Sequence, residues 1–351
     1  MRAAMAPLVV LFVFAAATMP TVQSFSCSNN GVTCNGLVGY VSPNTTTLSE
    51  IASMFGIQDS LHSLLGANNW SLSLPANQTV RANQTINIPF PCLCTNGSGR
   101  PKEPPVYKVL KGDILYHIAA EVFSRLVTFQ QIQLFNNMSD PNEIEIGQEL
   151  KIPLPCSCDE VEGERVVHYG YVVPYGQTVE EIAQKFKTTN QTLLQLNGLA
   201  SPKDLLGGVS IDVPLKACTS NVSGKSLDYP LLVSDGTTAF TAGNCVMCSC
   251  NAATNNWTLN CQPSHLTSSI WDTCPSMKCE ANAEALYLGN TTSSGCNRST
   301  CAYAGYTDTT ILTVLSSDYT CQGNNDSGAK LRVQGWSWSL VLVLLCFGSI
   351  Q

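Results

Sequence analysis

Residues 107–158 read YKVLKGDILYHIAAEVFSRLVTFQQIQLFNNMSDPNEIEIGQELKIPLPCSC. A short β-prone run opens the stretch and stops at Gly112. Asp113 then stands at the position of a helix N-cap, and apolar residues at helical spacing follow as far as Phe123. These signals predict a strand that turns sharply into a first helix.

The second half of the same stretch predicts another helix and a closing strand. Thr128 and Gln131 have capping-box spacing ahead of an apolar-periodic segment. A loop rich in turn formers covers residues 136–145, and apolar residues then alternate from Leu150 to Leu154. We therefore expect a strand–helix–helix–strand unit whose strands pair and whose helices pack on one face of the sheet.

This unit occurs three times in the chain, with a period of about sixty residues. An Ile-Ala pair marks the first helix of each copy, and a proline closes each final strand: Ile51, Ile118 and Ile182, then Pro89, Pro153 and Pro214. The first copy is degenerate because no Gly-Asp pair precedes its first helix. The third copy has Gly176-Gln177 in place of that pair.

The pattern Y-x-V-x-x-G-D…I-A…N…G-Q-x-L-x-I-P resembles the LysM module. Cys-x-Cys pairs separate the copies, as in the ectodomains of plant LysM receptors: Cys92/Cys94 and Cys156/Cys158. Together with the C-terminal tail, the chain resembles the GPI-anchored, chitin-elicitor-binding branch of that family. The resemblance implies an α+β fold, with three tandem βααβ LysM modules clamped by disulfides and followed by a small Cys-rich, mainly-β domain.

Both ends of the chain have the composition of processing signals. An apolar run near the N-terminus precedes small residues, which predicts a signal peptide with Phe25 as the first mature residue. The C-terminal small residues, polar spacer and short apolar tail predict a GPI signal with Ser327 as the attachment site. The alternatives are an uncleaved N-terminal anchor and a single-pass C-terminal helix, and both apolar runs are short for a membrane span.

The expected organisation has seven segments. They are a signal peptide (1–24), an N-terminal Cys segment (25–38), module one (39–91, degenerate), module two (106–155), module three (169–215), a Cys-rich domain (216–324) and a GPI-anchor signal (325–351).

The formal charge favours a neutral ligand. The whole chain carries −7, and the parts expected to be removed, 1–24 and 328–351, contain three basic residues and no acidic one, so the mature chain carries −10. An acidic protein is a poor partner for nucleic acid or for bare anionic lipid. We expect no nucleic-acid partner and a membrane attachment through the GPI lipid alone.

The cysteines predict a disulfide framework. Of 17 cysteines, Cys346 lies in the tail, and the remaining even number suits a secreted chain. Spacing leaves the pairing open, whereas the family resemblance implies three bridges around the modules: Cys27–Cys94, Cys34–Cys158 and Cys92–Cys156. Cys245-x-x-Cys248-x-Cys250 has a zinc-like spacing, but an oxidising compartment disfavours a metal site, and we expect no metal or cofactor.

The sequence holds twelve N-x-S/T acceptors for N-glycosylation. They are Asn44, Asn69, Asn77, Asn83, Asn96, Asn137, Asn190, Asn221, Asn256, Asn290, Asn297 and Asn325.

Catalysis is not indicated. Glycoside hydrolysis needs two carboxylates at a fixed separation. The acidic cluster from Asp159 to Glu164 is interpreted instead as a solvated linker, and the four histidines form no catalytic motif. We expect a binding protein and not an enzyme.

The candidate binding site consists of two neighbouring loops of module two. The first offers a glycine turn and the N–H groups of Asp113, Ile114 and Leu115, and the second offers carbonyls and apolar surface, with Ile144 expected to contact an acetyl methyl group. The candidate chitin-binding residues are Lys111, Gly112, Asp113, Ile114, Leu115, Tyr116, His117, Asp140, Pro141, Asn142, Glu143, Ile144, Glu145 and Ile146.

The resemblance implies a cell-surface pattern-recognition receptor of plant innate immunity. Its partners would be chitin (N-acetylglucosamine) oligosaccharides, a LysM receptor-like kinase co-receptor, and a second copy of the chain when ligand is bound. The alternatives are a peptidoglycan-binding LysM receptor and a structural wall-associated glycoprotein.

Overall fold

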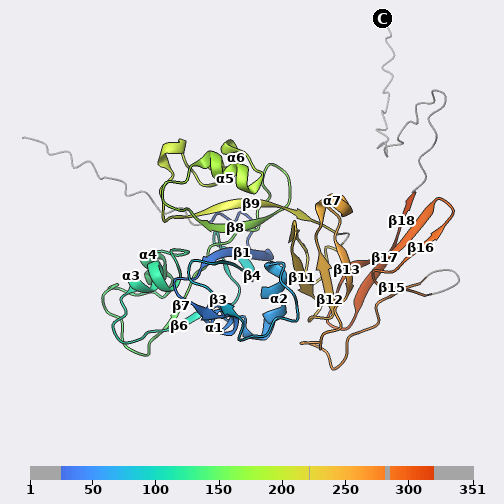
Figure 1. Ribbon diagram of the computed structural model, residues 1–351, viewed down its shortest axis with the longest axis horizontal. Coiled ribbons are helices and arrows are strands. Elements are labelled where there is room, and N and C mark those ends of the chain that lie inside the picture. The colour runs from blue at the N-terminus through green and yellow to red at the C-terminus, as the bar shows by residue number, and fades with distance from the viewer. Residues whose placement is uncertain (1–24, 221, 281–284, 320–351) are drawn as a thin grey trace, which may run out of the picture.

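The computed structural model describes residues 25–220, 222–280 and 285–319 (Figure 1). The expected signal peptide and the GPI signal with Ser327 lie outside these ranges. Within the described ranges, no helix is both long enough and apolar enough to cross a membrane.

Module one has two long antiparallel strands with two helices between them. β1 (Thr33–Val41) pairs with β4 (Thr85–Thr95), and α1 (Leu48–Met54) and α2 (Leu61–Ala67) lie between them in sequence. Three short elements complete the module: β2 (Thr46–Thr47), η1 (Gln58–Ser60) and β3 (Thr79–Val80).

Modules two and three repeat this order of elements. Module two contains β6 (Val106–Lys108), α3 (Leu115–His117), the π-helical η2 (Ile118–Val122), α4 (Phe129–Phe135) and β7 (Glu149–Lys151). Module three contains β8 (Val166–Val172), α5 (Val179–Phe186), α6 (Asn190–Leu196), η3 (Pro202–Asp204) and β9 (Ser210–Cys218). The predicted capping box of Thr128 and Gln131 is confirmed at the start of α4.

One asparagine fastens the second helix to the closing strand in every module. In module two, Asn136 donates from Nδ2 to the carbonyls of Ile132 and Lys151, both at 2.8 Å, and its Oδ1 accepts the Lys151 N–H at 2.9 Å. Asn68 makes the same three bonds in module one, and Asn197 makes them in module three. The same three bonds thus hold the second helix against the closing strand in all three segments.

Modules one and three share one sheet. Its strand order is β10-β9-β8-β1-β4-β5, which includes β5 (Ser98–Pro101) and β10 (Val233–Ser234). β1 and β8 pair in parallel, with Leu37 opposite Tyr169 and Val38 opposite Gly170. Module two keeps a separate two-stranded sheet of β6 and β7.

Modules one and two share a hydrophobic core instead of a sheet. Phe55 of module one and Phe123 of module two meet edge to face, with ring centroids 5.8 Å apart, inside one cluster of buried residues. Module three is the main part of a second cluster around Ile182 and Val213, which also includes Leu37 and Ala67 of module one. The three modules are therefore a single body, held by a sheet on one side and a core on the other.

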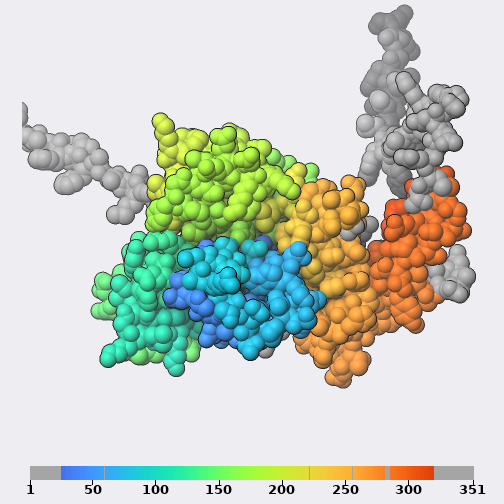
Figure 2. Space-filling view, viewed as in Figure 1, coloured from blue at the N-terminus to red at the C-terminus, as the bar shows by residue number. Residues whose placement is uncertain are grey.

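The Cys-rich domain lies beside the modules (Figure 2) and consists mainly of antiparallel hairpins. Its elements are β11 (Thr238–Thr241), β12 (Val246–Ser249), α7 (Ala252–Asn255), β13 (Asn260–Pro263), β14 (Lys278–Cys279), β15 (Leu286–Tyr287), β16 (Thr291–Ser294), β17 (Asn297–Tyr306) and β18 (Ile311–Tyr319). Between described residues its bridges include Cys218–Cys250, Cys245–Cys274, Cys248–Cys261 and Cys279–Cys301. The three cysteines with zinc-like spacing thus go to three different partners.

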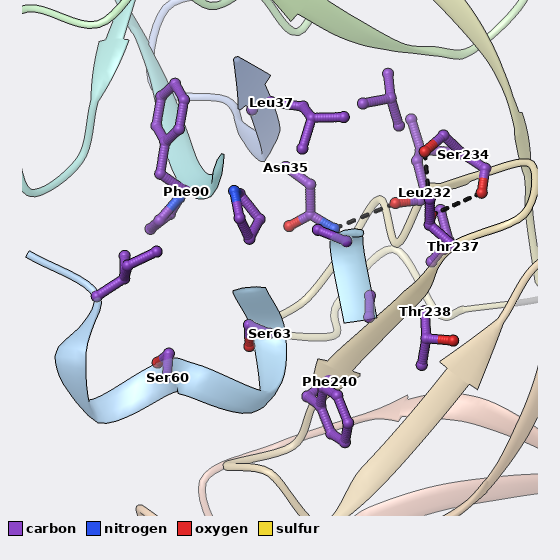
Figure 3. A pocket seen from close by; sticks show the side chains of 18 residues that line it. Asn35, Leu37, Ser60, Ser63, Phe90, Leu232, Ser234, Thr237, Thr238 and Phe240 are labelled. Carbon is purple, nitrogen blue, oxygen red and sulfur yellow. Dashed lines mark hydrogen bonds between the residues drawn. The ribbon is translucent and has the colours of Figure 1, made fainter. Parts of the chain in front are cut away.

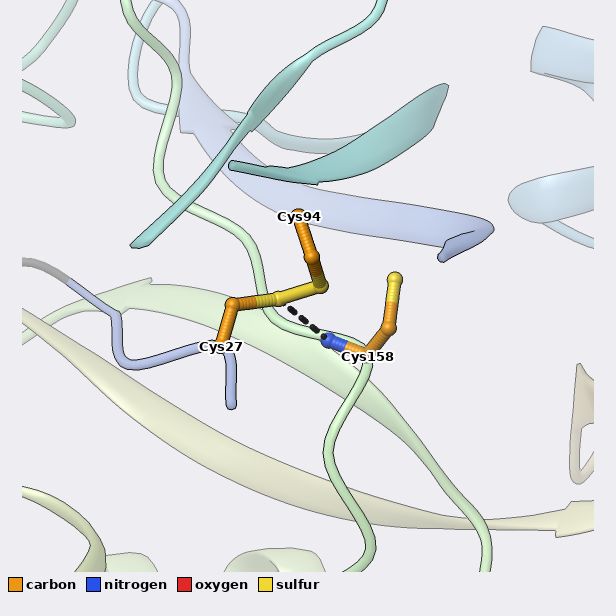
Figure 4. Close-up of side chains that lie close together, drawn as sticks. All are labelled: Cys27, Cys94 and Cys158. Atoms are coloured by element: carbon orange, nitrogen blue, oxygen red, sulfur yellow. Dashed lines mark hydrogen bonds between the residues drawn. A yellow bond between two sulfur atoms is a disulfide. The ribbon is translucent and has the colours of Figure 1, made fainter. Parts of the chain in front are cut away.

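Two disulfides connect the N-terminal segment with the linkers between modules, and a third connects the two linkers. The pairs are Cys27–Cys94, Cys34–Cys158 and Cys92–Cys156, the same pairs that the family resemblance implies. Their sulfur atoms gather in one place, and the N–H of Cys158 donates to the Cys27 sulfur at 3.3 Å (Figure 4).

The acidic linker is not simply solvated, contrary to expectation. The carboxylate of Asp159 accepts the N–H of Ser28 at 2.8 Å and its hydroxyl at 2.8 Å. Glu162 accepts the hydroxyl of Thr192 at 2.7 Å. The linker side chains therefore fasten the N-terminal segment and module three to each other.

Candidate functional site

The two candidate loops of module two lie side by side, as the repeat unit predicts. The N–H of Gly147 donates to the carbonyl of Val109 at 2.8 Å, and the N–H of Val109 donates to the carbonyl of Gln148 at 2.9 Å. These bonds extend the β6–β7 ladder toward the ends of both loops. The turn at 110–113 is consequently held next to the loop at 140–146.

Asp113 builds the turn, and it does not cap the helix as expected. Its carboxylate accepts the N–H of Leu110 at 2.7 Å, the hydroxyl of Tyr107 at 2.8 Å and a bond from Nδ1 of His117 at 3.0 Å. Burial alone would raise the pKa of Asp113, but these hydrogen bonds lower it below its ordinary value. The N–H of Asp113 donates to Leu110 O at 3.2 Å, so it is not free for a ligand. Gly112 supplies the positive φ, +94°, that the turn requires.

The first helix of module two begins at an uncapped end. Ile114 occupies the N-cap, and no side chain accepts a bond there. Thr47 and Thr178 hold the matching positions in modules one and three, and each accepts an N–H of its helix through its hydroxyl. The first helical bond of module two runs from the Ile118 N–H to Ile114 O. The N–H groups of residues 114–117 therefore precede the hydrogen-bond ladder and are available to a ligand.

The exposed apolar side chains of the site differ in part from those expected. Ile114 is 58% exposed, Tyr116 53% and Ile146 71%. Leu115, by contrast, is buried in the core. Ile144, which was expected to offer a free loop contact, is half-buried and packs on the shared core, so a charged residue there should destabilise the fold. Ile146 is the loop residue that can present a free apolar surface.

The remaining candidate residues frame this surface with polar groups. Asp140 accepts the N–H of Asn142 at 2.8 Å and its Nδ2 at 2.9 Å, which shapes the second loop. Lys111, Glu143 and Glu145 are exposed. Pro141 is half-buried beside them, and Nε2 of His117 lies 3.5 Å from Glu121. The two loops thus form a shallow surface of backbone donors, carbonyls and a few apolar side chains.

The sequons of the described ranges all lie on the surface. Their ten asparagines are exposed, and one of them, Asn137, stands just before the second loop. Asn221 and Asn325 lie outside the described ranges.

A separate cavity of about 240 Å³ lies where module one meets the Cys-rich domain (Figure 3). Nδ2 of Asn35 donates to the carbonyl of Leu232 across it at 3.2 Å, and Ser234 and Thr237 bond through their hydroxyls at 3.1 Å. No candidate site residue lines this cavity. It belongs to the junction between domains.

Comparison with known proteins agrees with the repeat. The LysM domain family matches residues 107–153 and 171–214. LysM domain-containing GPI-anchored protein 2 of Arabidopsis thaliana is 42% identical, over 97% of this chain and 96% of its own length. The chain belongs to the family of plant LysM domain-containing GPI-anchored proteins. The chitin elicitor-binding protein of Oryza sativa subsp. japonica is 38% identical over 93% of this chain and 92% of its own.

Two further proteins are similar to a smaller part of this chain than these family members are. An N-acetylmuramoyl-L-alanine amidase, sle1, from Staphylococcus epidermidis is 30% identical over 45% of this chain and 52% of its own length. The crystal structure of the ectodomain of a receptor like kinase has a TM-score of 0.44 and 20% identity, covering 53% of this chain and 93% of that one.

Proposed function

We propose that this LysM protein is a cell-surface receptor ectodomain that binds N-acetylglucosamine oligosaccharides of chitin through the two loops of module two. The observation that carries the proposal is the uncapped helix start beside exposed Ile114 and Ile146. An N-acetylglucosamine unit combines an amide donor and acceptor with an apolar methyl group, and this surface offers a partner for each. Its ligand is neutral, which suits an acidic chain.

We also propose that residues 39–91 are a third, divergent LysM module. The family match covers only the two later segments. Support comes from the Asn68 bonds and from the Thr47–Glu50 capping box, which has its counterpart at Thr178–Glu181 in module three. Sequons at Asn77 and Asn83 and the capped helix favour a structural role for this module.

Family membership places the protein at the outer face of the plasma membrane, attached through a GPI lipid. A lipid anchor reaches no cytosolic component, so we propose that the signal passes through a LysM receptor kinase. A ligand chain long enough to reach two receptors would also bring two copies of this protein together. The protein acts in this proposal by binding alone, in plant innate immunity.

The test is the replacement of Ile146 by glutamate in the secreted ectodomain. Burial of one methyl-sized apolar group is worth roughly 1 kcal/mol, and a charge adds desolvation, so we expect a tenfold or larger loss of affinity. The measurement is calorimetric titration with N-acetylglucosamine oligomers. Because Ile146 is on an exposed loop, its thermal unfolding should match that of the wild type.

The matched control is Leu206→Glu in the corresponding loop of module three, where the leucine is 63% exposed. This variant should bind as the wild type does. Equal losses in both variants, or none in Ile146→Glu, would place the sugar outside module two. Preference for peptidoglycan fragments would favour the peptidoglycan receptor, and binding to neither glycan would favour a structural wall glycoprotein.

A further inference from the structure

A groove of about 230 Å³ lies between modules two and three, next to the candidate loops. Module two lines it with Tyr116, Arg125 and Phe129, and module three with Gly208 and Val209. Most of the lining is apolar, and Arg125 is its only charged side chain. Tyr116 belongs both to this groove and to the candidate loops, so the two surfaces are continuous.

Two exposed tyrosines flank the groove. Tyr116 is 53% exposed at one side, and Tyr175 is 75% exposed at the edge formed by module three. A Cβ on Gly208 would lie 2.8 Å from the Tyr175 hydroxyl, so the glycine allows the tyrosine to approach the groove edge closely. The Arg125 guanidinium carbon is 6.0 Å from the centroid of the Tyr175 ring. An aromatic ring this exposed contributes little to the core of module three.

A strained turn brings Arg125 to this position. Ser124 and Arg125 follow η2 with φ values of +49° and +64°, a left-handed conformation that costs a non-glycine residue free energy. The N–H of Arg125 donates to Ala119 O at 2.9 Å, and the Ser124 hydroxyl donates to Val41 O. Strain that the surrounding structure maintains is often associated with a binding role.

We propose that this groove is a second subsite for the same β-1,4-linked N-acetylglucosamine chain, and the inference rests on the proposed function of module two. A pyranose ring has an apolar C–H face that can lie on a tyrosine, while its hydroxyl and acetamide oxygens accept bonds from a guanidinium. The chain would run from the module-two loops over Tyr116 to Tyr175. Long oligosaccharides then make contacts that short ones do not reach.

The experiment compares an N-acetylglucosamine tetramer with an octamer by calorimetric titration of the ectodomain. The wild type should bind the octamer more tightly. Tyr175→Ala should weaken octamer binding about fivefold or more and leave tetramer binding unchanged. The control is Tyr287→Ala in the Cys-rich domain, where the ring is 50% exposed and lies 4.9 Å from Nζ of Lys278, and this variant should bind both oligomers normally.

A second variant separates binding from folding. Arg125→Gly removes the guanidinium and relieves the left-handed strain, so octamer affinity should fall while the melting temperature is maintained. If Tyr175→Ala still binds the octamer more tightly than the tetramer, the gain comes from two copies of the protein on one sugar chain. That result overturns the proposal of a subsite in the groove. Equal affinity of the wild type for the tetramer and the octamer also overturns the groove proposal, and module two then remains the binding site. Failure of every oligomer to bind overturns both proposals.

Discussion

At the residue scale, position 114 distinguishes module two from its neighbours. The fold needs an N-cap there, and Thr47 and Thr178 provide one in modules one and three, whereas module two has an exposed isoleucine. An uncapped helix start forgoes stability that threonine would provide. Such a departure is expected where a residue serves a ligand instead of the fold.

Ile114→Thr should therefore change stability and affinity in opposite directions. The new cap should add about 1 kcal/mol to the free energy of unfolding. Loss of the apolar contact should weaken binding of N-acetylglucosamine oligomers several-fold. Chemical denaturation and calorimetric titration measure the two effects. The reciprocal control, Thr178→Ile, should lose about 1 kcal/mol of stability and bind normally. Undiminished affinity in Ile114→Thr would argue against the apolar contact.

The sequence predicted the two loops of this site but not the role of each residue. Glycine and a polar residue before a helix indicate a turn, yet they do not show whether Asp113 caps the helix or closes the turn on Leu110. Loop position likewise does not reveal burial, and Ile144 and Ile146 have similar sequence surroundings. Arg125 and Tyr175 were missed because they come from different modules and meet only in the folded chain.

At the scale of elements, a buried pair joins β8 to β9. Nδ1 of His168 lies 2.7 Å from a carboxylate oxygen of Asp212, and its Nε2 lies 2.8 Å from the carbonyl of Asp159. Asp212 also accepts and donates backbone bonds with Asn197. Both ring nitrogens face acceptors, so the geometry is best satisfied by a protonated ring. Scattered histidines in the sequence gave no indication of this pair.

This pair predicts that stability falls as pH rises. Burial would lower the pKa of His168, but Asp212 and Asp159 raise it above its ordinary value, and burial raises the pKa of Asp212. The folded pair thus binds more protons than the unfolded chain, and its contribution is present below pH about 6.5 and lost as pH rises through the folded pKa. Melting temperatures from pH 5 to 8 should decline in the wild type.

The comparison variant for this pH effect is His168→Gln, which should flatten the decline. His62→Gln serves as the control, because His62 contacts the ring of Phe240 at 6.0 Å and its replacement should preserve the wild-type profile. A decline of the same size in all three proteins would show that other groups titrate.

At the scale of the whole molecule, the modules are joined more closely than a repeat with linkers suggests. The sequence predicted three copies of one unit, since the local signals recur in each. It did not predict that β1 and β8 pair in parallel, because strands so far apart in sequence leave no local pattern. The same reason applies to β10, which brings the Cys-rich domain onto the edge of the sheet of modules one and three.

A substitution at Gly39 tests the pairing of β1 with β8. A Cβ at this position would overlap the hydroxyl of Tyr169, which donates to Oδ1 of Asn87 at 3.0 Å. Gly39→Ala should therefore force β1 and β8 apart and cost about 1–3 kcal/mol of stability, measured by chemical denaturation of the ectodomain. Gly224→Ala is the control, because a Cβ there meets nothing within 4 Å and the change should be nearly neutral.

The double variant Gly39→Ala/Tyr169→Phe decides whether the steric overlap is the cause. Tyr169→Phe alone should cost about 1 kcal/mol, through the lost hydrogen bond. Because removal of the hydroxyl relieves part of the overlap, the double variant should lose less than the sum of the single losses. Additive losses would mean that the two residues act independently and that the β1–β8 joint does not depend on their close approach. A smaller combined loss would show that the close approach of β1 and β8 at this point holds modules one and three together.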